Sequence, residues 1–310
     1  MLKLIGRRVV YMAATMLAAS VLLFLLFELS PQEVVVNALG PYATPEQQQA
    51  WLLANGYDRP ALIRYLDWLG RFVIGDWGMS RVLAAPVATL VWTHLANTAI
   101  LAFWFFVFLV PLSLGLGVIA GMREGSLPDR IISTACVIGA SVPPFASTVL
   151  VSAVFVFGLH WLPGTSSMID GFSYRELVMP VMVLVLYDFG YVARITRAAM
   201  SEVMTTAYMR TALLKGLPRG RVIIRHALRN ALIAPFTVLM LHVNWLIAGV
   251  IVVEFFFAYK GFGSLILEAS LGHDLFLLEA CTMVTVVIAV ATQTIADVAY
   301  VYLNPRIRFR

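Results

Sequence analysis

Long apolar stretches separated by shorter polar segments run through the whole 310-residue chain. Six of these stretches reach the roughly 20 residues with which an α-helix crosses about 30 Å of hydrocarbon. They lie at about 9–29, 95–121, 131–159, 178–200, 229–256 and 278–303. The pattern therefore predicts an all-α integral membrane protein with six transmembrane helices and both termini on the same side.

The spans predict four parts of the chain: an N-terminal transmembrane helix at 1–30, a long extramembrane segment at 31–94, a five-helix core at 95–303 and a short tail at 304–310. Three basic residues precede the first apolar stretch, as they do in a secretory signal. This stretch is too long for a signal, and no small-x-small cleavage site follows it. We therefore expect a retained helix that enters the membrane from the cytoplasm.

The extramembrane segment 31–94 has the signals of a folded structure rather than those of a linker. Thr44 is followed by Pro45 and an acidic residue, which is typical of an N-cap before a proline at the first helical position. We expect a helix from Pro45 to about Asn55, ended by Gly56.

A second amphipathic run in the same segment covers residues 63–72. Tyr65, Trp68 and Phe72 recur in it at spacings of three and four residues, so they share one face of a helix. We expect this face to lie against the bilayer or against the outer ends of the transmembrane helices.

Composition and charge exclude a soluble enzyme and give the chain an orientation. Hydrophobic residues make up 61% and charged residues 13% of the chain, against roughly 45–50% and 25% in soluble domains. The net charge of +5 indicates no nucleic-acid partner, because membrane proteins gather Lys and Arg in their cytoplasmic loops. With both termini in the cytoplasm, 16 of the 22 Lys and Arg residues fall on the cytoplasmic side. We therefore expect a multi-pass protein with cytoplasmic termini.

A search for catalytic or metal-binding motifs finds none. The chain contains no GxxxxGK[ST], HExxH, CxxC or GxSxG sequence. Its two cysteines lie inside apolar stretches, which is typical of small buried side chains. The five histidines are scattered singly, so we expect structural, hydrogen-bonded roles for them: His94, His160, His226, His242 and His273.

The most unusual feature is the polar loop 201–230, which is predicted to contain a short amphipathic helix at 207–217. One face is polar or small: Tyr208, Thr211, Ala212, Lys215 and Gly216. The other face is apolar: Met209, Leu213, Leu214 and Leu217. Four arginines follow it, so the loop could lie on anionic lipid. Alternatively, Ala212 and Gly216 would let another backbone approach closely, which favours a protein partner.

At this loop a family resemblance becomes specific. Residues 208–216 read YMRTALLKG and residues 225–233 read RHALRNALI. They resemble the EAA loop of binding-protein-dependent ABC importer permeases in the dipeptide, oligopeptide and nickel family, whose pattern is close to YVRTARAKG…RHALRNALIP. Further motifs agree, in order, with the first or B-type permease subunit of that family: GYDRP at 56–60, RYLDWL at 64–69, GDWG at 75–78 with Ser80, WLP at 161–163 and NPRIR at 304–308. The resemblance covers nearly the whole chain.

The resemblance implies a permease subunit of an ATP-driven importer in the bacterial inner membrane, working by alternating access. It implies three kinds of partner: a homologous second permease subunit, two cytoplasmic ABC ATPase subunits that bind ATP and Mg, and a periplasmic solute-binding protein. This chain would then be no enzyme and would hold no cofactor or metal. The residues implied to couple it to an ATPase are Tyr208, Met209, Arg210, Thr211, Ala212, Leu213, Lys215 and Gly216.

Two other classes fit the sequence less well. An ion-coupled secondary transporter commonly has internal repeats and interrupted spans, and no segment of this sequence recurs. A membrane-embedded enzyme needs histidines or acidic residues that converge at one depth, which the scattered histidines do not provide. The substrate stays open, because the family carries peptides, nickel, metal chelates, opines and oligosaccharides.

Two departures from the family pattern suggest an altered path lining. The family usually has Leu-Pro-x-Thr before the second span, where this chain has LANT at 95–98. It usually has Pro-Gly-x-Gly after the fifth span, where this chain has KGFG at 260–263.

Asp188 lies within the fourth predicted span, where an ionised carboxylate costs several kcal/mol unless it is paired or hydrated. It could be neutralised by an internal partner such as Arg194 or Arg197, or it could line a water-filled substrate path. Glu254 and Asp297 match acidic positions of the family and could be interhelical hydrogen-bonding groups or substrate ligands. The candidate path residues are therefore Asp188 and Glu254.

Overall fold

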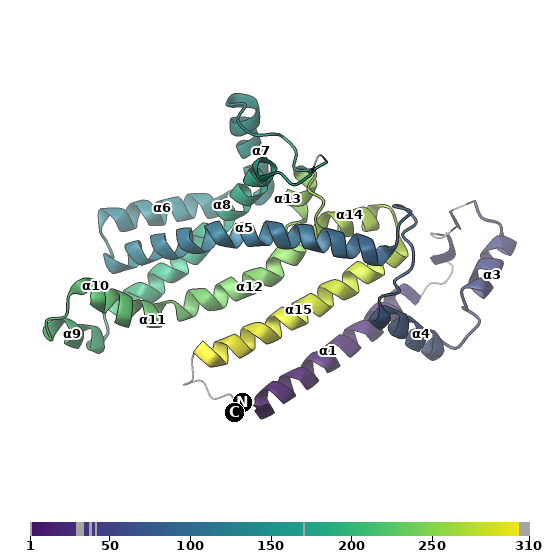
Figure 1. Cartoon of the computed structure of the whole chain (residues 1–310), viewed down its shortest axis with the longest axis horizontal. Coiled ribbons are helices and arrows are strands. Elements are labelled where there is room, and N and C mark those ends of the chain that lie inside the picture. The colour runs from purple at the N-terminus through teal and green to yellow at the C-terminus, as the bar shows by residue number, and fades with distance from the viewer. Residues whose placement is uncertain (1, 29–33, 37–38, 41, 170, 304–310) are drawn as a thin grey trace. The chain divides into compact units, whose positions relative to one another are not determined.

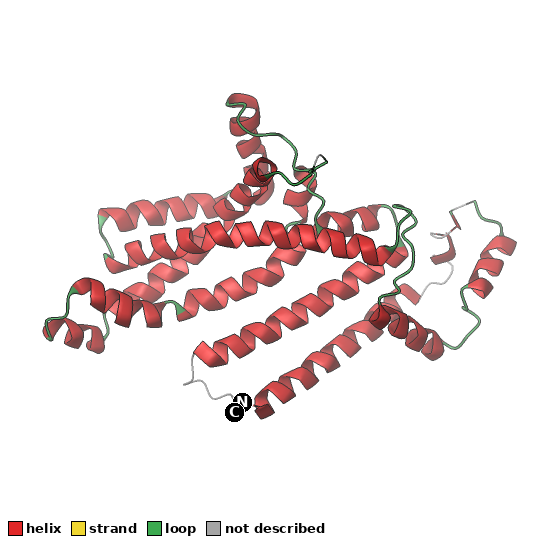
Figure 2. Ribbon diagram, viewed as in Figure 1, coloured by secondary structure: helices red, strands yellow, loops and turns green. Residues whose placement is uncertain are grey.

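The computed structural model describes residues 2–28, 34–36, 39–40, 42–169 and 171–303. Among these residues every regular element is helical and no strand occurs (Figure 2). The prediction of an all-α protein is therefore confirmed. The tail at 304–310, with its NPRIR motif, lies outside the described residues.

The chain forms two compact units, whose helices are labelled in Figure 1. The first unit combines Met1–Thr98 with Lys260–Thr294, and the second combines Ala99–Tyr259 with Ile295–Arg310. The first unit contains α1 (Leu2–Glu28), α3 (Pro45–Ala54), α4 (Ala61–Ile74), the start of α5 (Val87–Met122), α14 (Phe262–Leu271) and most of α15 (Leu275–Leu303). The second contains the rest of α5, α6 (Leu127–Ser141), α7 (Pro144–Ser152), η1 (Ala153–Gly158), α8 (Tyr174–Met204), α9 (Ala207–Leu214), α10 (Arg219–Val222), η2 (Ile223–Ala227), α11 (Leu228–Ala231), α12 (Ile233–Gly249) and α13 (Ile251–Phe256).

Four helices are long and apolar enough to cross a membrane by themselves, at Val9–Leu26, Val87–Met122, Tyr174–Met204 and Leu275–Ala296. Two bent pairs bring the total to six if each pair is one span: Leu127–Ser141 with Pro144–Gly158, and Arg219–Ala231 with Ile233–Val243. The described residues thus confirm an integral membrane protein with four to six candidate spans.

The predicted span 131–159 is bent by 100° between α6 and α7. Pro143 and Pro144 lie at the bend. A proline has no backbone N–H to donate and disfavours helical geometry in the residue before it, so the helix ends at Ser141 and restarts at Pro144. Apolar length alone predicted the amount of helix here but not its direction.

The two helices expected in the segment 31–94 are both present. The α3 helix begins after Thr44, whose hydroxyl accepts a hydrogen bond from the Gln47 N–H while the Gln47 side chain accepts one from the Thr44 N–H. Such a capping box satisfies two backbone donors that a helix start otherwise leaves unpaired. The α4 helix includes the predicted run 63–72 and ends at Gly75, whose φ of 85° is left-handed.

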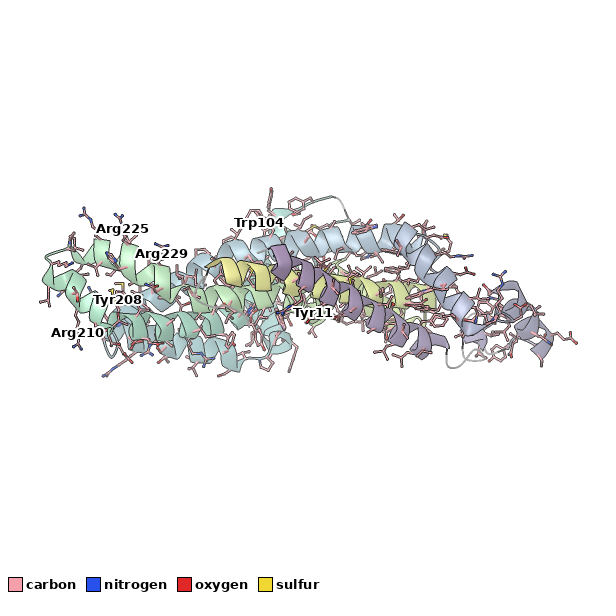
Figure 3. All side chains as sticks on the ribbon, turned by 90° about the horizontal axis from the view of Figure 1, so that it is seen from below. Tyr11, Trp104, Tyr208, Arg210, Arg225 and Arg229 are labelled. Atoms are coloured by element: carbon pink, nitrogen blue, oxygen red, sulfur yellow. The ribbon has the colours of Figure 1, made fainter. Side chains whose placement is uncertain are left out.

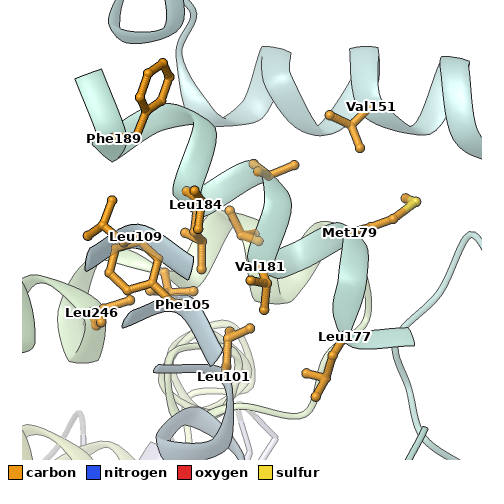
Figure 4. Close-up of a cluster of buried hydrophobic side chains, with 14 of the residues drawn as sticks. Leu101, Phe105, Leu109, Val151, Leu177, Met179, Val181, Leu184, Phe189 and Leu246 are labelled. Atoms are coloured by element: carbon orange, nitrogen blue, oxygen red, sulfur yellow. The ribbon is translucent and has the colours of Figure 1, made fainter. Parts of the chain in front are cut away.

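A cluster of aliphatic and aromatic side chains forms the core of the second unit (Figure 4). The α8 helix contributes the most, because 14 of its residues are buried. Leu101, Phe105 and Leu109 of α5 pack in the same cluster as Leu184 of α8 and Leu246 of α12.

Glycines let α8 pack unusually closely against its neighbours. A Cβ added at Gly190 would lie 2.4 Å from the backbone oxygen of Cys136 in α6. A Cβ at Gly117 of α5 would lie 2.5 Å from the Thr196 side chain in α8. Because real carbon atoms do not approach so closely, α5, α6 and α8 need these glycines to pack as they do.

The two segments that depart from the family pattern, LANT at 95–98 and KGFG at 260–263, contact each other within the first unit. The Asn97 side chain donates a hydrogen bond to the Lys260 carbonyl at 2.7 Å, and the Phe262 N–H donates one to the Thr98 hydroxyl at 2.7 Å. The second bond satisfies a backbone donor at the start of α14. These residues therefore join two chain segments, a role that the sequence did not predict.

Asp274 makes a second junction in this unit. One of its carboxylate oxygens accepts hydrogen bonds from the Ser80 hydroxyl at 2.6 Å, from the Arg81 N–H at 2.8 Å and from the Val82 N–H at 3.1 Å. Its other oxygen accepts one from the Leu277 N–H at 3.3 Å, in the first turn of α15. The serine of the GDWG-x-S motif thus anchors the segment before α5 to the start of α15.

Candidate functional site

The predicted amphipathic helix of the loop 201–230 is present as α9, which is shorter than expected and spans Ala207–Leu214. It begins after Thr206, whose backbone is extended. It ends because Gly216 has a φ of 76°, a left-handed conformation that glycine adopts without strain. The turn toward α10 therefore requires a glycine at position 216.

The inward face of α9 differs from the predicted one. Met209 and Ala212 are both buried and pack in one cluster with Met200 of α8, Val222 of α10 and Ala227 of η2. Ala212 follows Met209 by one turn, so the two share a face, and the small side chain of Ala212 lets α9 approach the chain's own helices. The expectation that Met209 and Ala212 lie on opposite faces is therefore wrong.

The outward face of α9 combines apolar and basic side chains: Tyr208, Arg210, Thr211, Leu213, Leu214 and Lys215. Leu214 is 88% exposed, the largest exposed fraction among the apolar residues of this helix. Arg225 and Arg229 are also exposed, and Figure 3 shows them with Tyr208 and Arg210 on the same helical cluster.

The two halves of the EAA-like motif contact each other directly. The Asn230 side chain donates hydrogen bonds to the Tyr208 hydroxyl at 3.2 Å and to the His226 carbonyl at 2.9 Å. In Figure 1, α9 lies beside α10 and α11 at one end of the second unit. The motif therefore builds one compact helical cluster that is joined to α8 on one side and to α12 on the other.

An ion-pair cluster braces the end of α8 that leads into this helical cluster. Arg197 of α8 donates hydrogen bonds to both carboxylate oxygens of Asp129 in α6, and its guanidinium lies 3.7 Å from Glu124. Asp129 also accepts a hydrogen bond from the Gly125 N–H at 2.8 Å, and Ser201 bonds to Glu124. A two-point arginine–carboxylate contact fixes orientation as well as distance, so α6 and α8 are held together here.

Asp188 has a partner that the sequence did not single out. It is 5% exposed, and its Oδ1 lies 3.3 Å from Nε2 of His242 in α12. Arg197 is engaged with Asp129, and Arg194 donates a hydrogen bond to the Gly190 carbonyl. The two arginines suggested as partners of Asp188 therefore bond elsewhere. No sequence pattern marks His242 as the partner, since 54 residues separate it from Asp188.

The hydrogen bonds of His242 restrict the protonation of the pair. Its Nδ1 lies 2.8 Å from the Val238 carbonyl, which can only accept, so Nδ1 carries a proton. Nε2 and Oδ1 then make a favourable contact only if a proton lies between them.

Aromatic side chains lie around His242. The ring of Tyr187 stacks on Trp245 with centroids 5.9 Å apart, and the rings of Tyr191 and Trp245 lie 6.1 and 6.3 Å from His242. Tyr191 is exposed, whereas Asp188 and His242 are buried.

Glu254, the other candidate path residue, is fully buried in α13. Burial raises the pKa of the nearby Tyr259 hydroxyl, and the charge of Glu254 raises it further. The role of Asp188 and Glu254 in the substrate path stays a proposal, and neither opens to the surface of the second unit. The side chain of Asp297 lies outside the described residues. Among the side chains that the structure describes, no group of three His, Cys, Asp or Glu could hold a metal ion.

Comparisons with known proteins identify the class to which these features belong. Residues 113–309 match the family described as "Binding-protein-dependent transport system inner membrane component", and residues 1–109 match the N-terminal family of the same membrane components. The chain belongs to this family of transport permeases and is a membrane permease subunit of an ABC importer.

Three relatives show where in the family it lies. A putative peptide transport system permease protein of Brucella abortus is 33% identical over the full length of both chains. The glutathione transport system permease protein GsiC of Escherichia coli K12 is 30% identical, again over both full lengths. The oligopeptide transport system permease protein AppB of Bacillus subtilis is 29% identical over 98% of each chain. The resemblance to the dipeptide, oligopeptide and nickel family of importer permeases is confirmed.

Proposed function

We propose that this permease subunit carries peptides or peptide-like solutes from a periplasmic binding protein into the cytoplasm. It would do so by alternating access, together with a homologous second permease subunit and two cytoplasmic ATPases that bind ATP and Mg. The named relatives act on peptides, oligopeptides and glutathione, which supports this solute class. A secondary transporter is not favoured, because the family is that of binding-protein-dependent systems.

The proposal that the chain couples to an ATPase rests on the helix α9. Its inner face is packed on α8 and α10, so a force applied to its outer face would reach the long helix α8 through these packed side chains. Closure of an ATP-bound ATPase dimer would then move α8 and α12 with α9. The residues proposed to contact the ATPase are those of the implied coupling set whose side chains are exposed, together with Leu214: Tyr208, Arg210, Thr211, Leu213 and Lys215. The other three residues of that set, Met209, Ala212 and Gly216, hold the helix in place.

Copurification tests the function directly. Tagged permease extracted in mild detergent from cells that express the complete system is expected to bring both ATPase chains and the second permease subunit with it. Mass spectrometry of the eluate would identify these chains. A permease that purifies alone under conditions that preserve other ABC importers would contradict the proposal.

The proposed topology places the segment 31–94 in the periplasm and the loop 201–230 in the cytoplasm. A cysteine at the exposed position Gln49 of α3 should react with a membrane-impermeant maleimide in intact spheroplasts. A cysteine at the exposed position Arg123, between α5 and α6, should react only after the membrane is opened. The background would lack Cys136 and Cys281, both of which are buried. The reverse labelling pattern would invert the topology.

A further inference from the structure

The α4 helix has three sectors that differ in chemistry. At 100° per residue, an aromatic sector contains Tyr65, Trp68 and Phe72, and a narrow charged sector contains Arg64, Asp67 and Arg71. A third, aliphatic sector carries no charge and contains Leu62, Ile63, Leu66, Val73 and Ile74. These five side chains are all exposed, and Val73 is 76% exposed.

The aromatic sector faces inward and fixes α4 to α1. The Tyr65 hydroxyl is hydrogen-bonded to the Ser20 hydroxyl at 2.8 Å. The Phe24 ring lies 5.4 Å from the Tyr65 ring and 6.1 Å from the Trp68 ring, between centroids. Of the two surroundings expected for this face, the bilayer or the ends of the transmembrane helices, Tyr65 and Trp68 show the second, because both contact α1.

The position of Ser20 sets the depth of this contact. Ser20 is buried within the apolar window Val9–Leu26 of α1, eight residues before the helix ends at Glu28. At 1.5 Å per residue it lies about 12 Å inside that end of the helix. The Tyr65 hydroxyl therefore meets the side of α1 within its apolar window, which places this contact at the depth of the apolar part of the helix.

The exposed surface of α1 continues this apolar environment. Leu22, Leu25 and Leu26 are exposed near the end of α1, and only 11% of its apolar window is buried within the chain. A transmembrane helix with such a surface faces lipid or other membrane chains. The aliphatic sector of α4 lies at the end of the same helix and offers the same chemistry.

We propose that α4 is an interfacial helix whose aliphatic sector is inserted among lipid acyl chains beside the Glu28 end of α1. The exposed charges at its edge, Arg71 and Asp67, then lie at the level of the lipid phosphates and water. The sector lacks the aromatic and arginine side chains that dominate protein–protein contact energy, which favours lipid over a protein partner. An amphipathic helix with one aliphatic face and charges along its edge fits a bilayer surface.

Collision measurements with nitroxide labels test this placement. The complete transporter, with single labels at Leu66 or Val73 in a background lacking the native cysteines, would be reconstituted into phosphatidylethanolamine and phosphatidylglycerol vesicles. The matched control is a label at Gln49, which is exposed on α3. Oxygen concentrates in lipid and a nickel chelate concentrates in water, so the ratio of their collision rates reports depth.

We expect the oxygen-to-nickel ratio at Leu66 and Val73 to exceed that at Gln49 severalfold. Equal ratios at the three sites would place α4 in water and overturn the proposal. Immobile labels at Leu66 and Val73 that neither reagent reaches would show that a protein chain covers the sector, and would also overturn it. Neither outcome depends on the solute or on ATPase coupling.

Discussion

Replacing His242 by leucine is expected to lower the free energy of unfolding by about 1–5 kcal/mol, the range between removing one partner of a buried hydrogen bond and one partner of a buried ion pair. The substitution removes the group that contacts Asp188, which is 5% exposed and whose Oδ2 has no hydrogen-bond partner among the described residues. The carboxyl group would then be buried within α8 with no partner at all. Thermal unfolding of the purified complex in detergent measures the loss.

Two further variants test whether the contact between Asp188 and His242 is the source of this stability. Asp188→Asn keeps a side chain that can donate a hydrogen bond to Nε2, so it should lose much less stability than His242→Leu. The double variant Asp188→Leu with His242→Leu replaces the pair by apolar groups and should recover most of the loss, since apolar replacements of buried pairs are often neutral. A double variant as unstable as His242→Leu alone would show that the contact is not the source of the stability.

The same variants distinguish the two roles considered for Asp188. If the double variant is stable and transports peptides normally, the pair is structural and the path hypothesis is wrong. If it is stable but transports cationic peptides several-fold more slowly, the carboxyl group acts on the solute. Stability and transport therefore separate explanations that the sequence alone left open.

Local signals in the sequence predicted the elements well. The helix at 45–55 depends on Thr44 and Gln47, which lie within three residues of each other and form the capping box seen in the structure. Apolar length predicted the long helices because each must satisfy its backbone hydrogen bonds within itself in lipid. Both kinds of signal are contained in the element that they predict.

Contacts between elements could not be predicted in the same way. The partners Asp188 and His242 are separated by 54 residues, and Ser80 and Asp274 by 194. A single sequence carries no distance information over such separations. Arg197 was a reasonable partner for Asp188 on charge alone, yet Asp129 binds it with two oxygens.

The face of α9 was predicted incorrectly for a related reason. Grouping Ala212 with the polar residues treated its small size as a contact surface for another protein. The structure shows that a small residue serves equally well to let α9 lie against its own chain, and Met209 one turn earlier is buried with it. Which neighbour a small residue admits depends on tertiary packing and not on the helix itself.

Replacing Leu214 by aspartate is expected to abolish coupling between ATP hydrolysis and transport while leaving the fold intact. Leu214 is 88% exposed on α9, so the carboxylate meets water in the free subunit and costs little stability. Against an ATPase surface the same carboxylate would be buried without a partner, which costs several kcal/mol and prevents docking.

The matched control is Leu53→Asp, an exposed leucine of α3 given the same change. In reconstituted vesicles Leu214→Asp should lose solute-stimulated ATPase activity and most of the copurified ATPase, whereas Leu53→Asp should retain the copurified ATPase. Unchanged ATPase association in Leu214→Asp would show that the outer face of α9 is not the docking surface.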